Sequence, residues 1–164
     1  MKTVMNHILF PFATTKRSYN ILLSVVSLAP VLYSIYIFLT MGKDDITFPE
    51  FLQQNAWNSI LFLAALLNLA WLYILFKIHP GVENQHHDDY TGFILWIFFI
   101  SQIMVTNILL AIISGIVLFK MKVKLWQVLN TKTMFKQKTL TFMALSLLLF
   151  SLICGYAFIQ MTLS

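Results

Sequence analysis

Histidine and carboxylate side chains gather in one polar segment of the chain, between residues 77 and 90. Imidazole nitrogens and carboxylate oxygens are the donors that zinc and similar divalent ions accept. The candidate metal ligands are His79, Glu83, His86, His87, Asp88 and Asp89. A metal site and pH sensing by the paired histidines are two interpretations. We favour a third, a solvated loop, because the spacing is loose and Pro80 and Gly81 predict a turn.

Other catalytic patterns do not occur in the sequence. It contains no G-x-S-x-G elbow around a nucleophilic serine and no glycine-rich phosphate loop. Cys154 is the only cysteine, which excludes a disulfide or a thiolate metal cage within one chain. We therefore predict no catalytic residues, no enzyme activity, and no cofactor other than a possible zinc ion.

A lysine segment runs from residue 120 to residue 138 and contains no acidic residue. Such a mixture of lysine with apolar residues suits an anionic lipid surface or an acidic protein partner, and it can also simply orient the chain in the membrane. Nucleic acid is a poorer match, because few aromatic residues are interleaved. The candidate binding residues are Lys120, Lys122, Lys124, Trp126, Lys132, Lys136 and Lys138.

Small and uncharged polar residues recur inside the long apolar stretches of the chain. In membranes such residues let helices approach closely and hydrogen-bond to one another, and in an oligomer they can also line a pore. The candidates for helix packing or pore lining are Ser27, Ser34, Asn58, Asn68, Gln102, Asn107, Gly115 and Gly155.

The elements that carry these residues are predicted from the distribution of charge. The chain has 164 residues, of which 59% are hydrophobic and 10% charged. Four long windows lack charge, and each exceeds the roughly 20 residues that a helix needs to cross a bilayer. We therefore predict an all-α integral membrane protein with a single domain over residues 1–164. It would be a four-transmembrane-helix bundle with short loops and spans at about 19–41, 57–76, 91–119 and 140–161.

Four crossings would place the histidine loop and the lysine segment on opposite sides of the membrane. Positive residues favour the cytoplasmic side. With the N-terminus inside, that side holds Lys2, Lys16, Arg17 and Lys77; with the N-terminus outside, it holds Lys43 and the lysine segment. The count leans toward an outside N-terminus. A preference for lysine over arginine, with abundant Phe, Ile and Asn, suggests an AT-rich genome and a bacterial inner membrane.

Two functions fit these expectations. The first is a non-enzymatic membrane subunit that acts through a protein partner or membrane complex, for example an accessory component in bacterial defence, immunity or secretion. The alternative is a homo-oligomeric channel or small-solute carrier with an uncharged polar lining. The predicted partners are the lipid bilayer, a protein partner or further copies of the chain, and anionic lipid at the lysine segment.

Overall fold

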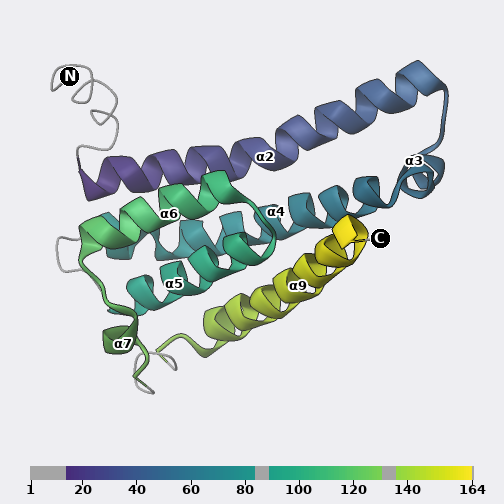
Figure 1. The fold of residues 1–164 in the computed structure, drawn as a ribbon. Coiled ribbons are helices and arrows are strands. Elements are labelled where there is room, and N and C mark those ends of the chain that lie inside the picture. Colours follow the sequence, from purple (N-terminus) through teal and green to yellow (C-terminus); the bar gives the residue numbers. More distant parts are fainter. Residues whose placement is uncertain (1–13, 84–88, 131–135, 164) are drawn as a thin grey trace, which may run out of the picture.

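The computed structural model describes residues 14–83, 89–130 and 136–163, and every regular element in these ranges is a helix (Figure 1). Three helices are long and apolar enough to cross a membrane: α2 (Thr15–Asp44), α4 (Ala56–Glu83) and α9 (Lys138–Leu163). They contain the predicted spans 19–41, 57–76 and 140–161. The all-helical membrane class is thus supported, with three long helices rather than four.

Local sequence signals begin and end the first two helices. The Thr14 side chain caps α2 by accepting a hydrogen bond from the Arg17 N–H at 3.2 Å. Short helix α3 (Phe48–Gln54) follows, and there Glu50 Oε2 accepts from the N–H of Thr47 at 2.7 Å and from its hydroxyl at 2.8 Å. Both bonds favour the carboxylate and hold the pKa of Glu50 below its usual range.

The predicted turn at Pro80 and Gly81 is wrong, because α4 continues through both residues to Glu83. A Cβ on Gly81 would lie within 2.2 Å of the Thr91 hydroxyl oxygen, so the missing side chain lets α4 pack against the start of α5 (Asp89–Met104). Close packing between two helices thus favours the helical conformation here despite the proline.

The predicted third span, residues 91–119, is not one helix. The window is divided into α5 and α6 (Ile108–Met121), which are antiparallel and packed together as a hairpin. At about 1.5 Å per residue, their 16 and 14 residues reach about 24 and 21 Å, short of the roughly 30 Å of hydrocarbon in a bilayer. The four-helix bundle is therefore not confirmed, and the hairpin enters and leaves at one end of the molecule.

Backbone N–H groups at the turn of the hairpin find acceptors within the turn itself. The N–H of Asn107 donates to the Gln102 carbonyl at 2.9 Å, and the N–H of Val105 donates to the Ser101 carbonyl at 3.1 Å. Thr106 adopts the left-handed region with φ 58°, and the Asn107 side chain caps α6. Asparagine favours such caps over helix interiors, which accounts for the position of the break.

A hairpin in place of a crossing changes the arrangement of the loops. The segment between α4 and α5 and the segment between α6 and α9 both begin and end at the same end of the molecule, together with the start of α2 (Figure 1). Four crossings would have separated the histidine loop and the lysine segment, whereas the described residues that flank the two segments lie at one end of the molecule. We call this the basic end, and we call the end that carries α3 and the C-terminus of α9 the opposite end.

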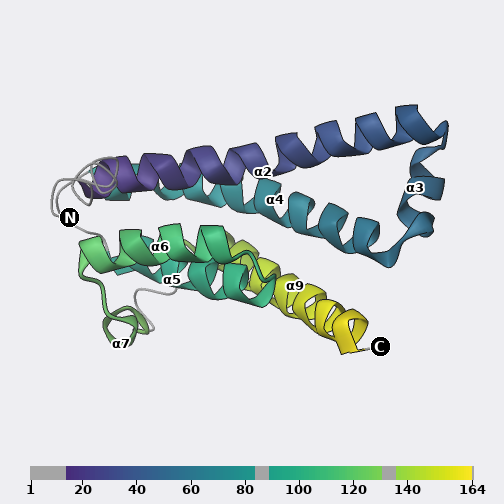
Figure 2. The same cartoon turned by 45° about the horizontal axis from the view of Figure 1, so that its top comes forward.

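The buried core lies in the half of the molecule nearer the basic end. There the Tyr19 hydroxyl donates to the Leu75 carbonyl at 2.6 Å, and the Trp71 and Phe98 rings pack edge to face. Figure 2 shows the hairpin lying against only this half of α2. Beyond it α2 is largely exposed, with Phe38 78% and Leu39 64% accessible, as expected of a surface that faces lipid.

Candidate binding site at the basic end

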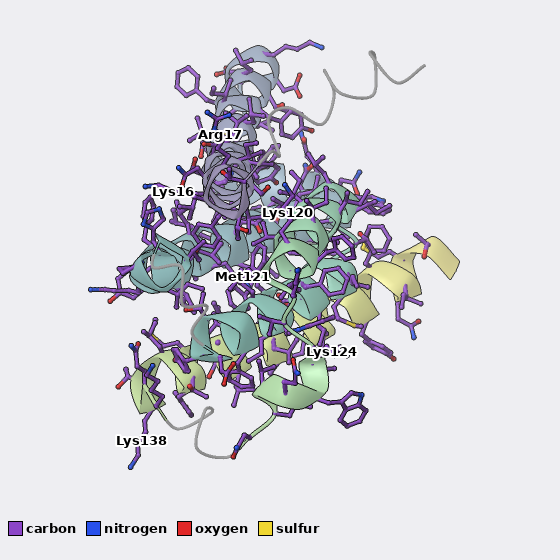
Figure 3. All side chains as sticks on the ribbon, turned by 90° about the vertical axis from the view of Figure 1, so that its left-hand side faces the viewer. Lys16, Arg17, Lys120, Met121, Lys124 and Lys138 are labelled. Atoms are coloured by element: carbon purple, nitrogen blue, oxygen red, sulfur yellow. The ribbon has the colours of Figure 1, made fainter. Side chains whose placement is uncertain are left out.

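Positive charge is concentrated at the basic end (Figure 3). Among the described residues, Lys43 is the only Lys or Arg at the opposite end, where it is accompanied by Asp44, Asp45 and Glu50. The basic end combines cations from four different helices and their flanking residues. These are Lys16, Arg17, Lys77, Lys120, Lys122, Lys124, Lys136 and Lys138.

A cavity of about 880 Å³ opens at this end, between α5, α6 and the short helix α7 (Leu125–Val128). Its walls are mainly apolar, with Lys122 and Lys124 the charged residues of the lining. Cavities of about 300–1,000 Å³ are large enough for small-molecule ligands. The aromatic and small residues that shape it are Trp96, Phe99, Gly115, Phe119, Val123 and Trp126.

The stretch between α6 and α7 forms one wall because it is fixed to α5. The Trp96 indole N–H donates to the Val123 carbonyl at 3.2 Å. A Cβ on Gly92 would lie within 2.5 Å of a Val123 methyl group, so glycine permits this close approach. Lys122, with φ 54°, ends α6 in the left-handed region and turns the chain toward α7. These contacts hold Lys122 and Lys124 in the lining of the cavity, at the end away from the hairpin turn, which we call its mouth.

A second cavity of about 430 Å³ continues along the hairpin toward its turn. It shares Phe99 and Gly115 with the first cavity, and it ends at Thr106 and Ile108. A Cβ on Gly115 would lie 3.4 Å from the Phe99 ring, so a side chain larger than alanine would extend into the junction of the two cavities. The two cavities adjoin at Phe99 and Gly115, and we call the pair the hairpin groove.

The predicted metal ligands are only partly described. Glu83, His86, His87 and Asp88 have side chains outside the described residues. His79 pairs with the Asn20 amide oxygen at 3.2 Å and packs against Tyr19, while Asp89 is an exposed residue at the start of α5. Within the described part of the chain, no three His, Cys, Asp or Glu residues gather into a metal-binding group.

Four of the predicted packing or pore residues lie at or beside the hairpin. Gln102, Asn107 and Gly115 belong to it, and Gly155 of α9 packs against its turn. A Cβ on Gly155 would lie 2.3 Å from the Met104 carbonyl oxygen, which is a backbone atom. Gln102 is 2% exposed, and within the described chain its side-chain oxygen has no hydrogen-bond partner.

The other predicted packing or pore residues do not join this group. The Ser27 and Ser34 hydroxyls donate to carbonyls of their own helix, at 2.8 Å in each case. Asn58 donates from its side chain to the Phe51 carbonyl at 2.8 Å, and so links α4 to α3. Asn68 is buried within α4. These residues therefore do not form one continuous polar lining within a single protomer.

The lysine segment is partly at the groove and partly away from it. Lys122, Lys124 and Trp126 line the cavity, and Lys120 occupies the last turn of α6. Lys136 and Lys138 lie at the start of α9, and Figure 3 shows Lys138 well separated from Lys124. Lys132 lies outside the described residues.

Sequence reasoning missed a buried polar network that joins three helices. The Trp71 indole N–H donates to the Ser101 hydroxyl at 3.0 Å, and that hydroxyl pairs with the Ser151 hydroxyl at 2.5 Å. The network links α4, α5 and α9 in the core. Trp96 and Phe99 were not predicted from the sequence either. Aromatic residues in an apolar window give no signal that separates a groove wall from a lipid-facing surface.

No protein-family model, curated protein or solved structure matches the chain. Function must therefore be inferred from the chemistry of the basic end and of the hairpin.

Proposed function

We propose that the chain is a non-enzymatic membrane subunit, with its basic end in the cytoplasm, that acts by docking an acidic protein partner on that end. The observation that carries this proposal is the gathering of cations from several helices at the basic end, opposite an end where acids outnumber Lys43. Three crossings put the N-terminus, the histidine loop and the lysine segment on one side, which the preference of positive residues makes cytoplasmic. With three crossings, every Lys and Arg of the sequence except Lys43 would lie on the cytoplasmic side.

Orientation is tested by labelling single cysteines in a Cys154→Ser background. We expect His86→Cys and Lys122→Cys to react with a membrane-impermeant maleimide only after the cytoplasmic face is opened. A Thr47→Cys variant should react from outside, in intact cells. Labelling of positions 86 and 122 from opposite faces would restore four crossings and overturn the proposed arrangement.

Partner binding is tested by charge removal away from the groove. In the Lys136→Gln/Lys138→Gln variant, a protein that co-purifies with the wild type should be lost, because the acidic surface of the partner loses its counter-charges. The matched Lys136→Arg/Lys138→Arg variant keeps the charge and should retain the partner. The cysteine labels confirm that each variant keeps its orientation.

Lys43→Gln removes one cation from the opposite end and serves as a further control. Co-purification should also weaken as salt is raised, because exposed charges are screened over about 10 Å at 0.1 M ionic strength. Retention of the partner by the glutamine variant at low salt would overturn the docking role of this end.

One observation favours the channel as a second candidate. The side-chain oxygen of Gln102 is buried beside the turn of the hairpin without a hydrogen-bond partner in the described chain, and such an oxygen can coordinate a permeating solute or ion. A Gln102→Leu variant reconstituted in vesicles should then lose solute flux while it still assembles. Unchanged flux, or no flux in the wild type, would remove this candidate.

A further inference from the structure

The hairpin groove has the form of a site for a long apolar chain. It runs from Lys122 and Lys124 at its mouth, past Gly115 and Phe99, to Thr106 beside the turn. Helix α6 has 14 residues, so its length is about 21 Å, whereas one leaflet contributes about half of the 30 Å hydrocarbon core. A groove along α6 therefore spans the depth that the acyl chain of one lipid occupies.

Charge at the mouth indicates the headgroup that such a lipid would carry. Lys122 and Lys124 line this part of the groove, where an anionic phosphate would lie at the membrane surface. Trp126 beside them is 86% exposed and Phe119 is 84% exposed, although both are large aromatic side chains. Tryptophan is enriched where headgroups meet hydrocarbon, so the mouth lies at the level of the lipid phosphates.

The backbone at the mouth of the groove includes a residue in the energetically unfavourable left-handed region. Lys122 has φ 54°, a region that glycine or asparagine adopts more readily than lysine. The bond from Trp96 to Val123 and the contact of Val123 with Gly92 fix the following residues against α5. The backbone thus holds Lys122 and Lys124 in the lining of the groove.

We propose that the hairpin groove binds one acyl chain of an anionic phospholipid from the leaflet at the basic end, with the lipid phosphate against Lys122 and Lys124. Both the acyl chain and the headgroup of the lipid are bound. The apolar groove accepts the chain, and the two ammonium groups select the negative headgroup. This site does not depend on the proposed protein partner, whose docking is tested at Lys136 and Lys138.

The experiment is native mass spectrometry of the whole chain in detergent, titrated with phosphatidylglycerol or with phosphatidylcholine of the same acyl chains. We expect one phosphatidylglycerol to bind more tightly than phosphatidylcholine. The Lys122→Asn/Lys124→Gln variant should weaken phosphatidylglycerol binding by about tenfold or more, since each lysine near an anionic surface contributes about 1 kcal/mol. Asparagine at position 122 keeps a residue that tolerates the left-handed backbone.

A Gly115→Leu variant separates the groove from its charged mouth. Its side chain would project toward Phe99 at the junction of the cavities and should weaken both lipids alike. If this variant does not fold, Phe119→Ala, which removes an exposed side chain from the groove wall, should weaken both lipids without affecting the core.

The matched control is the Lys136→Gln/Lys138→Gln variant, which removes the same charge from the same end but not from the groove. It should bind phosphatidylglycerol like the wild type, even if it loses the protein partner. Equal binding of the two lipids by the wild type would overturn the proposal. So would equal loss of phosphatidylglycerol in the control and in the Lys122→Asn/Lys124→Gln variant, which would indicate a general surface charge effect.

Discussion

Helix α2 and the α5–α6 hairpin show two ways in which a similar length of apolar chain can be folded for a membrane. Helix α2 has 30 residues without a break, and its buried residues are confined to the stretch from Ser18 to Val26. The hairpin divides its sequence into helices of 16 and 14 residues, and both helices have many buried side chains. A continuous helix satisfies its own backbone and can face lipid, whereas a turn at depth needs protein packed around it. The hairpin should therefore be more sensitive to substitution than α2.

The largest difference in stability is expected when alanine replaces either of two glycines, Gly155 beside the turn or Gly42 in α2. A Gly155→Ala substitution puts a Cβ 2.3 Å from the Met104 carbonyl oxygen, and a backbone atom of the turn cannot move aside cheaply. We expect it to lower the stability by about 1–3 kcal/mol, as overpacking does in cores. Gly42 has no heavy atom within 4 Å of such a Cβ, so Gly42→Ala should be neutral or slightly stabilising. Thermal denaturation in detergent micelles measures both, and equal effects would contradict the comparison.

The next largest change is a gain in stability, which we expect from a substitution in the hairpin turn. Thr106 is β-branched and adopts φ 58°, which is costly for such a residue. Thr106→Gly should raise the stability by about 1 kcal/mol, because glycine adopts this region without a clash between its side chain and the backbone. Thr40→Gly replaces a threonine with helical backbone in α2 and should instead lower the stability. The same denaturation assay applies, and destabilisation by Thr106→Gly would show that the turn is not strained.

The long helices were predictable from the sequence because crossing a bilayer demands length and an absence of charge, and both are visible along the chain. The hairpin also left a signal, although it was not recognised. The window at residues 90–119 is longer than a crossing needs, and Asn107, a residue that favours helix caps, divides it into two parts that are each too short to span.

The groove could be predicted only in part. Lysines and Trp126 at the membrane surface are recognisable from composition, and they do line the mouth. The packing of Val123 against Gly92 is not recognisable, because it requires α6 to return beside α5 instead of continuing across the membrane. Expecting one helix over residues 91–119 thus concealed the groove between α5 and α6.

A smaller effect is expected from the polar network that holds α4, α5 and α9 together. Trp71→Phe and Ser151→Ala each remove one bond to the Ser101 hydroxyl, and hydrogen bonds between membrane helices contribute on average about 0.6 kcal/mol. A double-mutant cycle should show coupling between the two positions, because both act through the same hydroxyl group. In α2 the Ser34 hydroxyl bonds to a carbonyl of its own helix, so Ser34→Ala should have almost no effect. Additive single effects at Trp71 and Ser151 would mean that the three groups do not act together.

The smallest change in stability is expected at the exposed N-terminal cap of α3. It contrasts with the cap that Asn107 provides inside the hairpin. Glu50 accepts two hydrogen bonds from Thr47, and they lower the pKa of the carboxyl below its usual range. A lowered pKa in the folded state means that this stabilisation is present above the usual pKa of the carboxyl and is lost as the pH falls through the lowered value. The melting temperature of the wild type should therefore exceed that of Glu50→Gln slightly at neutral pH, and the gap should close in acid as the pH falls through the lowered pKa. The Asn107→Ala variant, whose cap does not titrate, should instead differ from the wild type by the same amount at both pH values. A gap between the wild type and Glu50→Gln that persists in acid would show that the carboxylate charge is not what stabilises the α3 cap.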